Sequence, residues 1–482
     1  MPQPASVFPR SPGSVAIVGA GIVGMSAAHF LSRAGWQVTV YDSGTVASGA
    51  TGSADGAVSV ASKKPGPLMT LAVAAVRFYE HLTETGILLD EYLPRSTFVV
   101  ASDAEELAVL ERHAAELEAA GVPIRLLKGA ALAQTIGAAA PSAIAAVEVQ
   151  GEGHAVGYRV VERLRQLGGF AIRRNCPVSG LHTSNGRVTG VITAHGAEPV
   201  DAVLLAAGLG STHFLAGGDL IRPRKGQLIV TDRAGSDAPH FPGPLMSCRY
   251  LVSKGSQPAD KAAESRSLGL VIDPLRTGQF LIGGSREDRD DRDAADAAIV
   301  ASLLRDAVAL APSLAQLRVI RVFAGLRAAT SDGMPIVGRV HGADNVWIAT
   351  GFEGDGICLG PMMGRLCQQM ICGERLEQDI APPRRRPLRS HPGGGGMSGS
   401  GQTFLFDGVA IPFGTNETIA MALDRAGISS LGAGQGSSAG RYFCGIGACQ
   451  ACAVSVDGIS MEACLTPARS GLLVTRIVPV SP

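Results

Sequence analysis

The chain has 482 residues, of which 46% are hydrophobic and 17% are charged. This length predicts two or three domains, and the composition excludes wholesale disorder. The 42 basic residues balance the 42 acidic ones, so nothing indicates a nucleic-acid or acidic-membrane partner. No apolar run approaches the roughly 20 residues of a membrane-spanning helix. Residues 1–13, expected to be a flexible tail, lack an apolar signal core, so we expect a cytoplasmic protein.

The first predicted element is a strand at 15–18, which enters the glycine motif Gly19-x-Gly21-x-x-Gly24. A helical pattern follows, and a second strand, "QVTVYD", ends at Asp42. Strand, glycine turn, helix and strand in this order are typical of a βαβ unit that binds a dinucleotide. The glycines would permit the tight turn, the approach of the pyrophosphate and close helix packing, while Asp42 would accept ribose hydroxyls. The flanking strands disfavour the alternative, a glycine turn without a ligand.

The middle of the chain alternates helical and strand-like segments. Between 102 and 121 we expect an amphipathic helix, with Ser102 and Glu105 as its capping box. Strand-like segments such as "QLIV" and "FLIGGS" follow. This interleaving predicts a nucleotide-binding domain interrupted by a mixed α/β substrate domain, at roughly 76–140 and 216–322.

Residues 381–401 change abruptly to Pro, Arg, Gly and Ser, which predicts a flexible linker and a domain boundary. The segment 402–482 is short for an ordinary core, so an additional staple such as a metal centre is expected there.

Four of the nine cysteines lie in this last segment, as Cys444-x4-Cys449-x2-Cys452 followed by Cys464. The first three match the plant-type [2Fe–2S] spacing, and two irons need four soft thiolate ligands. Zinc is the main alternative, but zinc sites usually show C-x2-C twice, and the first gap here is four. The segment before them, "TFLFDGVAIPFGTNETIAMALDRAGI", predicts a hairpin and a helix, as in a β-grasp ferredoxin.

Residues 14–380 resemble the glycine oxidase and D-amino acid dehydrogenase group of FAD enzymes. The resemblance lies in the opening glycine motif, the loop "ASGATGSADGAVS", the strand "AVLLAAGLGS", and the closing "AGLRAATSDGMPIVGR" and "VWIATGFEGDGICLGPMMGRL". It implies an α/β fold: a Rossmann-like FAD-binding domain with the mixed α/β substrate domain inserted, followed here by the ferredoxin-like domain.

The resemblance also implies roles for single residues. Arg327 would hold the substrate carboxylate, for which a guanidinium fork is suited, with a surface ion pair as the alternative. FAD contacts are implied in the loop, the second nucleotide strand and the closing turn, at Ser48, Gly52, Gly208, Gly351, Gly354, Gly356 and Ile357. The backbone amides of the closing turn would stabilise the reduced flavin. No flavin role is assigned to Asp55, which stands where the family loop often has Asn.

The short interval before Cys464 is similar to the small iron–sulfur subunits of hydrogen cyanide synthase, opine oxidases and hydroxyproline dehydrogenases. There a glycine-oxidase-like subunit works beside a ferredoxin-like one, and here the two are fused. This implies an FAD-dependent dehydrogenase that transfers hydride to the flavin from a small amino or imino acid: a D-amino acid, hydroxyproline, glycine or an opine.

Electrons would then leave through the [2Fe–2S] cluster. A second flavoprotein subunit or a quinone-linked acceptor would be the partner, and could hold the protein at the inner membrane. An oxidase that uses oxygen and an electron-transfer subunit of a larger complex are the alternatives.

Overall fold

The computed structural model describes residues 12–184, 187–215, 220–235, 237–251, 266–291, 295–380, 402–414, 417–426, 428, 430–433, 439–440 and 452–477. The chain forms two compact units, 1–390 and 391–482, and each is described by itself. The predicted linker, 381–401, lies outside the described residues. Among the described helices, none is long and apolar enough to cross a membrane.

The first unit contains a six-stranded sheet, in which the strand before the glycine turn lies between two parallel neighbours. In sheet order the strands are β19 (Ile336–Arg339), β20 (Val346–Thr350), β13 (Ala202–Leu205), β1 (Ser14–Val18), β2 (Gln37–Tyr41) and β9 (Phe170–Arg173). All neighbours are parallel except β19 and β20. The apolar run of β1 is buried, as expected for a parallel strand covered on both faces. This sheet confirms the Rossmann-like prediction.

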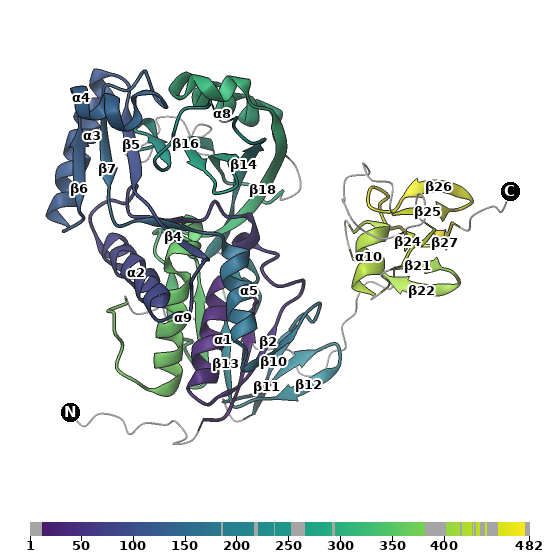
Figure 1. The fold of residues 1–482 in the computed structure, drawn as a ribbon. Coiled ribbons are helices and arrows are strands. Elements are labelled where there is room, and N and C mark those ends of the chain that lie inside the picture. Colours follow the sequence, from purple (N-terminus) through teal and green to yellow (C-terminus); the bar gives the residue numbers. More distant parts are fainter. Residues whose placement is uncertain are drawn as a thin grey trace. The chain divides into compact units, whose positions relative to one another are not determined.

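Helices α1 (Ile22–Arg33) and α9 (Gly356–Cys372) pack against this sheet. Helix α5 (Gly157–Leu167) packs on α1, and α2 (Pro67–Glu84) packs on α9. Helices α1 and α9 lie side by side in Figure 1 and in the contacts. Small residues allow this approach, because a Cβ at Gly364 would come 2.4 Å from the Cβ of Ser26, and one at Gly360 would come 2.7 Å from Ile22. The close packing fixes the N-terminus of α9 beside that of α1.

A second, eight-stranded sheet forms the other half of the unit. In sheet order its strands are β18 (Val319–Thr330), β14 (Ile221–Thr231), β17 (Phe280–Glu287), β16 (Arg266–Pro274), β15 (Leu245–Ser247), β5 (Thr97–Ala101), β7 (Ala145–Val149) and β6 (Ile124–Leu127). Helices α3 (Ala104–Ala119), α4 (Gly129–Leu132) and α8 (Ala297–Leu310) accompany it. The strands of this sheet come from 97–149 and 221–330, and we propose these limits for the inserted domain. Helix α2, which precedes the first of these segments, packs with α9 of the nucleotide-binding part and is therefore left out of the inserted domain.

The capping box predicted for α3 is wrong by one residue. Asp103 is the N-cap, and its side chain accepts a hydrogen bond from Glu106 N at 2.8 Å. The carboxylate of Glu106 accepts in return from Ser102 N at 2.8 Å. Ser and Asp are both good N-caps, so the sequence is compatible with a capping box that begins at Ser102 or at Asp103. Glu106 decides between them, because in this register it also pairs with Arg249 at 2.8 Å.

The first unit also contains two small three-stranded sheets. They comprise β3 (Ala57–Val58), β8 (Gly153–Ala155) and β4 (Tyr92–Pro94), and β10 (Gly180–Ser184), β11 (Arg187–Thr193) and β12 (Gly196–Pro199).

In the described part of the second unit, a five-stranded sheet is accompanied by the helix α10 (Ile419–Arg425). In sheet order the strands are β22 (Val409–Pro412), β21 (Thr403–Phe406), β27 (Leu473–Arg476), β25 (Ala453–Val456) and β26 (Ile459–Glu462). A short pair, β23 (Gly432–Ala433) and β24 (Ala439–Gly440), stands apart. The parallel pair β21–β27, flanked by two hairpins, is the predicted β-grasp arrangement. Alternate residues such as Phe404, Phe406 and Val454 fill its core.

Candidate active site

The glycine turn after β1 leaves no room for a side chain at Gly19 or at Gly24. Gly19 has φ +114, and a Cβ there would come 2.3 Å from the carbonyl oxygen of Ala206. A Cβ at Gly24 would come 2.0 Å from the carbonyl oxygen of Gly19. Gly21 is less confined, with Thr51 Oγ1 at 3.2 Å. Two of the three glycines are therefore required by packing, while Gly21 keeps the backbone open beside the helix N-terminus.

A cavity of about 360 Å³ opens at this turn and gathers most of the predicted nucleotide contacts. Its wall includes Gly19, Gly21, Asp42, Ser48, Gly208, Gly351 and Gly356. The carboxylate of Asp42 accepts from Ala20 N at 2.7 Å and from Gly44 N at 2.8 Å. Because a carboxylate offers about four acceptor positions, Asp42 can brace the turn and still accept from a sugar hydroxyl.

A second cavity, of about 620 Å³, adjoins the first, since the two share Ile22, Ala50, Thr51, Glu353 and Gly356. It contains the predicted residues Arg327, Gly354 and Ile357, and also Asp55. Gly24 and Gly52 line neither cavity; a Cβ at Gly52 would come 2.4 Å from Ala47 O. The continuous space, glycine-lined at one end and charged at the other, fits an elongated dinucleotide and a small substrate.

Arg327 lies on β18 and reaches across the neighbouring strand β14. Its Nη1 donates to the carbonyl oxygens of Ser285, at 3.0 Å, and Lys225, at 3.3 Å. A Cβ at Gly226 would come 2.3 Å from Nη2, so the glycine provides the space for the guanidinium. None of the ion pairs found in the described part of the chain includes Arg327. Burial, and then the nearby Arg286, lower the pKa of Arg327.

Sequence reasoning missed the groups around Arg327. Arg286 lies over the ring of Tyr250, with Cζ 5.4 Å from the ring centroid, and both residues line the second cavity. Glu353 accepts from Arg224 at 3.0 Å and lies 3.6 Å from Arg286. Glu353 has φ +46, a conformation that favours glycine, which is a sign of a constrained turn. No local motif marks Arg286 or Tyr250, and although Glu353 stands in the closing turn, only the folded chain brings it to Arg224 and Arg286.

Two other basic side chains on this cavity, those of Lys63 and Arg95, form close ion pairs. Lys63 contacts Asp355 at 2.7 Å; burial opposes its charge, but Asp355 raises the pKa of Lys63 above its usual value. Arg95 contacts Asp273 at 2.5 Å, and burial raises the pKa of Asp273 to about 7 although Arg95 lowers it. These two pairs neutralise Lys63 and Arg95, whereas Arg327 has no ion pair among the described residues.

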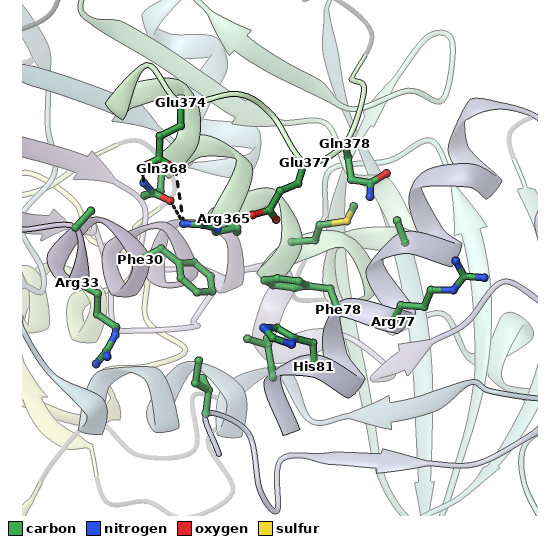
Figure 2. Close-up of a pocket in the computed structure, with 15 residues that line it drawn as sticks. Phe30, Arg33, Arg77, Phe78, His81, Arg365, Gln368, Glu374, Glu377 and Gln378 are labelled. Carbon is green, nitrogen blue, oxygen red and sulfur yellow. Dashed lines mark hydrogen bonds and ion pairs between the residues drawn. The ribbon is translucent and has the colours of Figure 1, made fainter. Parts of the chain in front are cut away.

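A larger cavity, of about 710 Å³, lies between α1, α2 and α9 (Figure 2). Arg365, which lines this cavity, contacts Gln368 and pairs with Glu377 at 3.0 Å. The positive charge of Arg365 is therefore compensated by a residue of the same wall. The cavity shares no lining residue with the two cavities above. We therefore place the site in the adjoining pair.

Two of the four predicted iron–sulfur ligands lie among the described residues. Cys452 directly precedes β25, and Cys464 follows β26. Ala463 N donates to Cys452 O at 3.0 Å, so the hairpin brings the two cysteines to the same end. Both are buried. Cys444 and Cys449 lie outside the described residues. The paired position of two thiols fits part of a four-thiolate site.

Comparison with known proteins agrees with this architecture. The profile of the "FAD dependent oxidoreductase" family matches residues 14–370, and that of a "2Fe-2S iron-sulfur cluster binding domain" matches residues 402–478. Glycine oxidase from Pseudomonas putida is 28% identical over 389 residues, 76% of this chain and 97% of that protein. Hydrogen cyanide synthase subunit HcnC from Pseudomonas aeruginosa is 28% identical over 214 residues, 44% of each chain.

The crystal structure of glycine oxidase from Bacillus cereus superposes with a TM-score of 0.67 at 22% identity, covering 77% of this chain and 99% of that one. The cofactors implied by the two matched domains are FAD and a [2Fe–2S] cluster. The glycine-lined cavity and the thiol pair are consistent with both. The chain thus belongs to the FAD-dependent oxidoreductase family and carries a [2Fe–2S] domain in addition.

Proposed function

We propose that the protein is a dehydrogenase that oxidises the carbon–nitrogen bond of a small amino or imino acid and passes the electrons to its own cluster. The similarity to glycine oxidases supports a substrate that combines an amine with a carboxylate. The candidates remain a D-amino acid, hydroxyproline, glycine or an opine.

The position of Arg327 carries the proposal. Its guanidinium is oriented by two neutral carbonyl oxygens, which leave its positive charge uncompensated at close range. Such a group, exposed to a cavity, binds a carboxylate strongly because two parallel charge-assisted hydrogen bonds can form. The substrate carboxylate would lie there, and its α-carbon would point toward the adjoining turn at Gly354 and Gly356.

The residues for FAD are those of the adjoining cavities. The positive end of α1, opened by Gly21, would face the pyrophosphate, and Asp42 would accept the ribose hydroxyls. When bound, FAD accepts the hydride that leaves the substrate carbon. Gly354, Gly356 and Ile357 would offer backbone amides to the ring. Tyr79 fixes this turn, since its hydroxyl donates to Ile357 O at 2.8 Å.

The [2Fe–2S] domain would give the electrons a route out of the flavin. Cys444, Cys449, Cys452 and Cys464 would hold the cluster. Similarity to the HcnC subunit supports a multi-subunit assembly, so a second flavoprotein or a quinone-linked acceptor is the proposed partner.

An anaerobic screen of amino and imino acids on the purified holoenzyme tests this function. We expect at least one of them to bleach the oxidised flavin without oxygen. Mixing the reduced enzyme with oxygen then separates the two classes: slow reoxidation supports a dehydrogenase, and fast reoxidation with peroxide formation indicates an oxidase. A flavin that no amino or imino acid reduces would contradict the proposal.

A further inference from the structure

The cavity near Arg327 contains a second guanidinium, that of Arg286. On β17, Gly284 and Arg286 share one face, because side chains alternate along a strand. A Cβ at Gly284 would come 3.5 Å from Nη2 of Arg327. Two residues along the strand span roughly 7 Å. Arg286 and Arg327 line the same cavity, so a small molecule with an acid at each end could contact both.

Neither guanidinium has, among the described residues, a carboxylate as close as those that pair with Lys63 and Arg95 on the same cavity. Glu353 is the carboxylate near Arg286, at 3.6 Å, and it is already hydrogen-bonded to Arg224 at 3.0 Å. Asp55 also lines the cavity and acts on Arg327 electrostatically, but no ion pair within 4.0 Å joins them in the described chain. Lys63 and Arg95, by contrast, have carboxylates at 2.7 and 2.5 Å. One substrate carboxylate on Arg327 would leave Arg286 with Glu353 alone, at 3.6 Å, a carboxylate that it shares with Arg224.

Arg286 is also held in position. Its Cζ lies 5.4 Å from the ring centroid of Tyr250, and Gly269 makes room for that ring, because a Cβ there would come 2.2 Å from it. An arginine stacked on an aromatic ring presents its N–H groups sideways with little loss of freedom. This arrangement costs like-charge repulsion with Arg327, which an anionic ligand would relieve.

We propose that Arg286 and Arg327 form a two-carboxylate site, so that the preferred substrate is an amino or imino dicarboxylate. The inference rests on the proposed function and narrows its substrate class. Arg327 would bind the carboxylate beside the oxidised carbon, and Arg286 would bind the carboxylate on the far side of the nitrogen. Opines belong to this class, whereas glycine and hydroxyproline do not.

Matched pairs of compounds test the proposal on the FAD-loaded enzyme. Sarcosine and iminodiacetate differ by one carboxylate, and anaerobic flavin bleaching gives their relative kcat/KM. Methoxyacetate and diglycolate are the corresponding ethers, and calorimetry gives their dissociation constants without turnover. We expect the dicarboxylate to be favoured in each pair by at least about tenfold, since a hydrogen bond to a charged group contributes that much.

Arg286→Gln should bring both ratios close to one, and Arg286→Lys should keep part of the preference. Arg276→Gln, in the exposed turn between β16 and β17, is the charge-matched control and should leave the ratios unchanged. Ratios near one in the wild type, or ratios that Arg286→Gln does not alter, would overturn the two-carboxylate site alone. If no amino or imino acid reduced the flavin, the proposed function itself would fail.

Discussion

At the residue scale, Arg327 combines a fixed orientation with an available charge. Its Nη1 donates to Ser285 O and Lys225 O, which are neutral acceptors. A carboxylate partner would have oriented the guanidinium as well, but it would also have neutralised it. The space that Gly226 leaves lets the side chain cross the sheet to reach the cavity.

Arg327→Ala should lower kcat/KM for the best substrate by roughly a hundredfold or more, because it removes a bidentate charged contact. Arg327→Lys should recover only part of the loss, since it keeps the charge without the fork. Anaerobic flavin reduction measures both. Arg321→Ala, on an exposed position of the same strand, is the control. Unchanged kinetics in Arg327→Ala would remove this residue from the site.

His29 predicts a pH dependence of stability. It is buried in α1, and neither ring nitrogen has a hydrogen-bond partner among the described residues. Burial, and then Arg33, lower the pKa of His29 to about 4. The unfolded chain therefore binds a proton that the folded state does not, and the free energy of unfolding decreases as pH falls from about 6.5 toward 4.

His29→Leu should reduce this pH dependence, by up to about 1.4 kcal/mol per pH unit in that window. Urea unfolding at pH 7 and pH 5 gives the comparison. His81→Leu, at an exposed position of α2, is the matched control. If the free energy of unfolding decreased by the same amount from pH 7 to pH 5 in the wild type and in His29→Leu, His29 would not be the source of the pH dependence.

At the same scale, the sequence could indicate Arg327 because it stands in a local motif. It could not indicate Arg286 or Tyr250, which lie outside every motif, or the contacts that Glu353 of the closing turn makes with Arg224 and Arg286. Their meeting depends on the register of β14 with β17 and β18, which is set by tertiary packing.

At the scale of elements, the unit β1–α1–β2 was predictable, since its periodicity and glycine spacing are local signals. The order of the second sheet was not, because β5 pairs in parallel with β15, more than a hundred positions later. The contact between α1 and α9 was equally remote, although the small residues that permit it are visible in the sequence.

Gly24→Val should abolish or strongly reduce FAD binding. A side chain at this position would overlap the carbonyl oxygen of Gly19, 2.0 Å from the Cβ, and would push α1 away from the turn. The flavin content of purified protein is the measurement, with circular dichroism to verify folding. Gly235→Val is the control, because no atom lies within 4 Å of a Cβ there. A folded Gly24→Val protein with full flavin content would contradict the assignment.

At the scale of the whole molecule, both domains were predictable from motifs, whereas nothing in the sequence reports how the two units are arranged. The cysteine spacing indicated the metal centre, and the structure adds that a hairpin brings Cys452 and Cys464 together. Cys444 and Cys449 stay predictions.

Cys452→Ser and Cys464→Ser should each destabilise the cluster while flavin reduction by substrate stays close to the wild-type rate. The reason is that the thiolates belong to the second unit and the flavin cavity to the first. Iron content and the rate of flavin bleaching are the two readouts, and Cys372→Ser, in the first unit, is the control. Full iron content in either variant, or stoichiometric zinc in the wild type, would refute the ligand assignment.

The most direct test of the account is an anaerobic titration of the complete protein with limiting substrate and no external acceptor. Flavin absorbance and the electron paramagnetic resonance signal of the reduced cluster are followed together. We predict that electrons from the substrate appear in the cluster after the flavin has been reduced, so that both centres share them. A flavin that stays fully reduced beside a cluster that stays oxidised would contradict the claim that the [2Fe–2S] domain is the electron outlet.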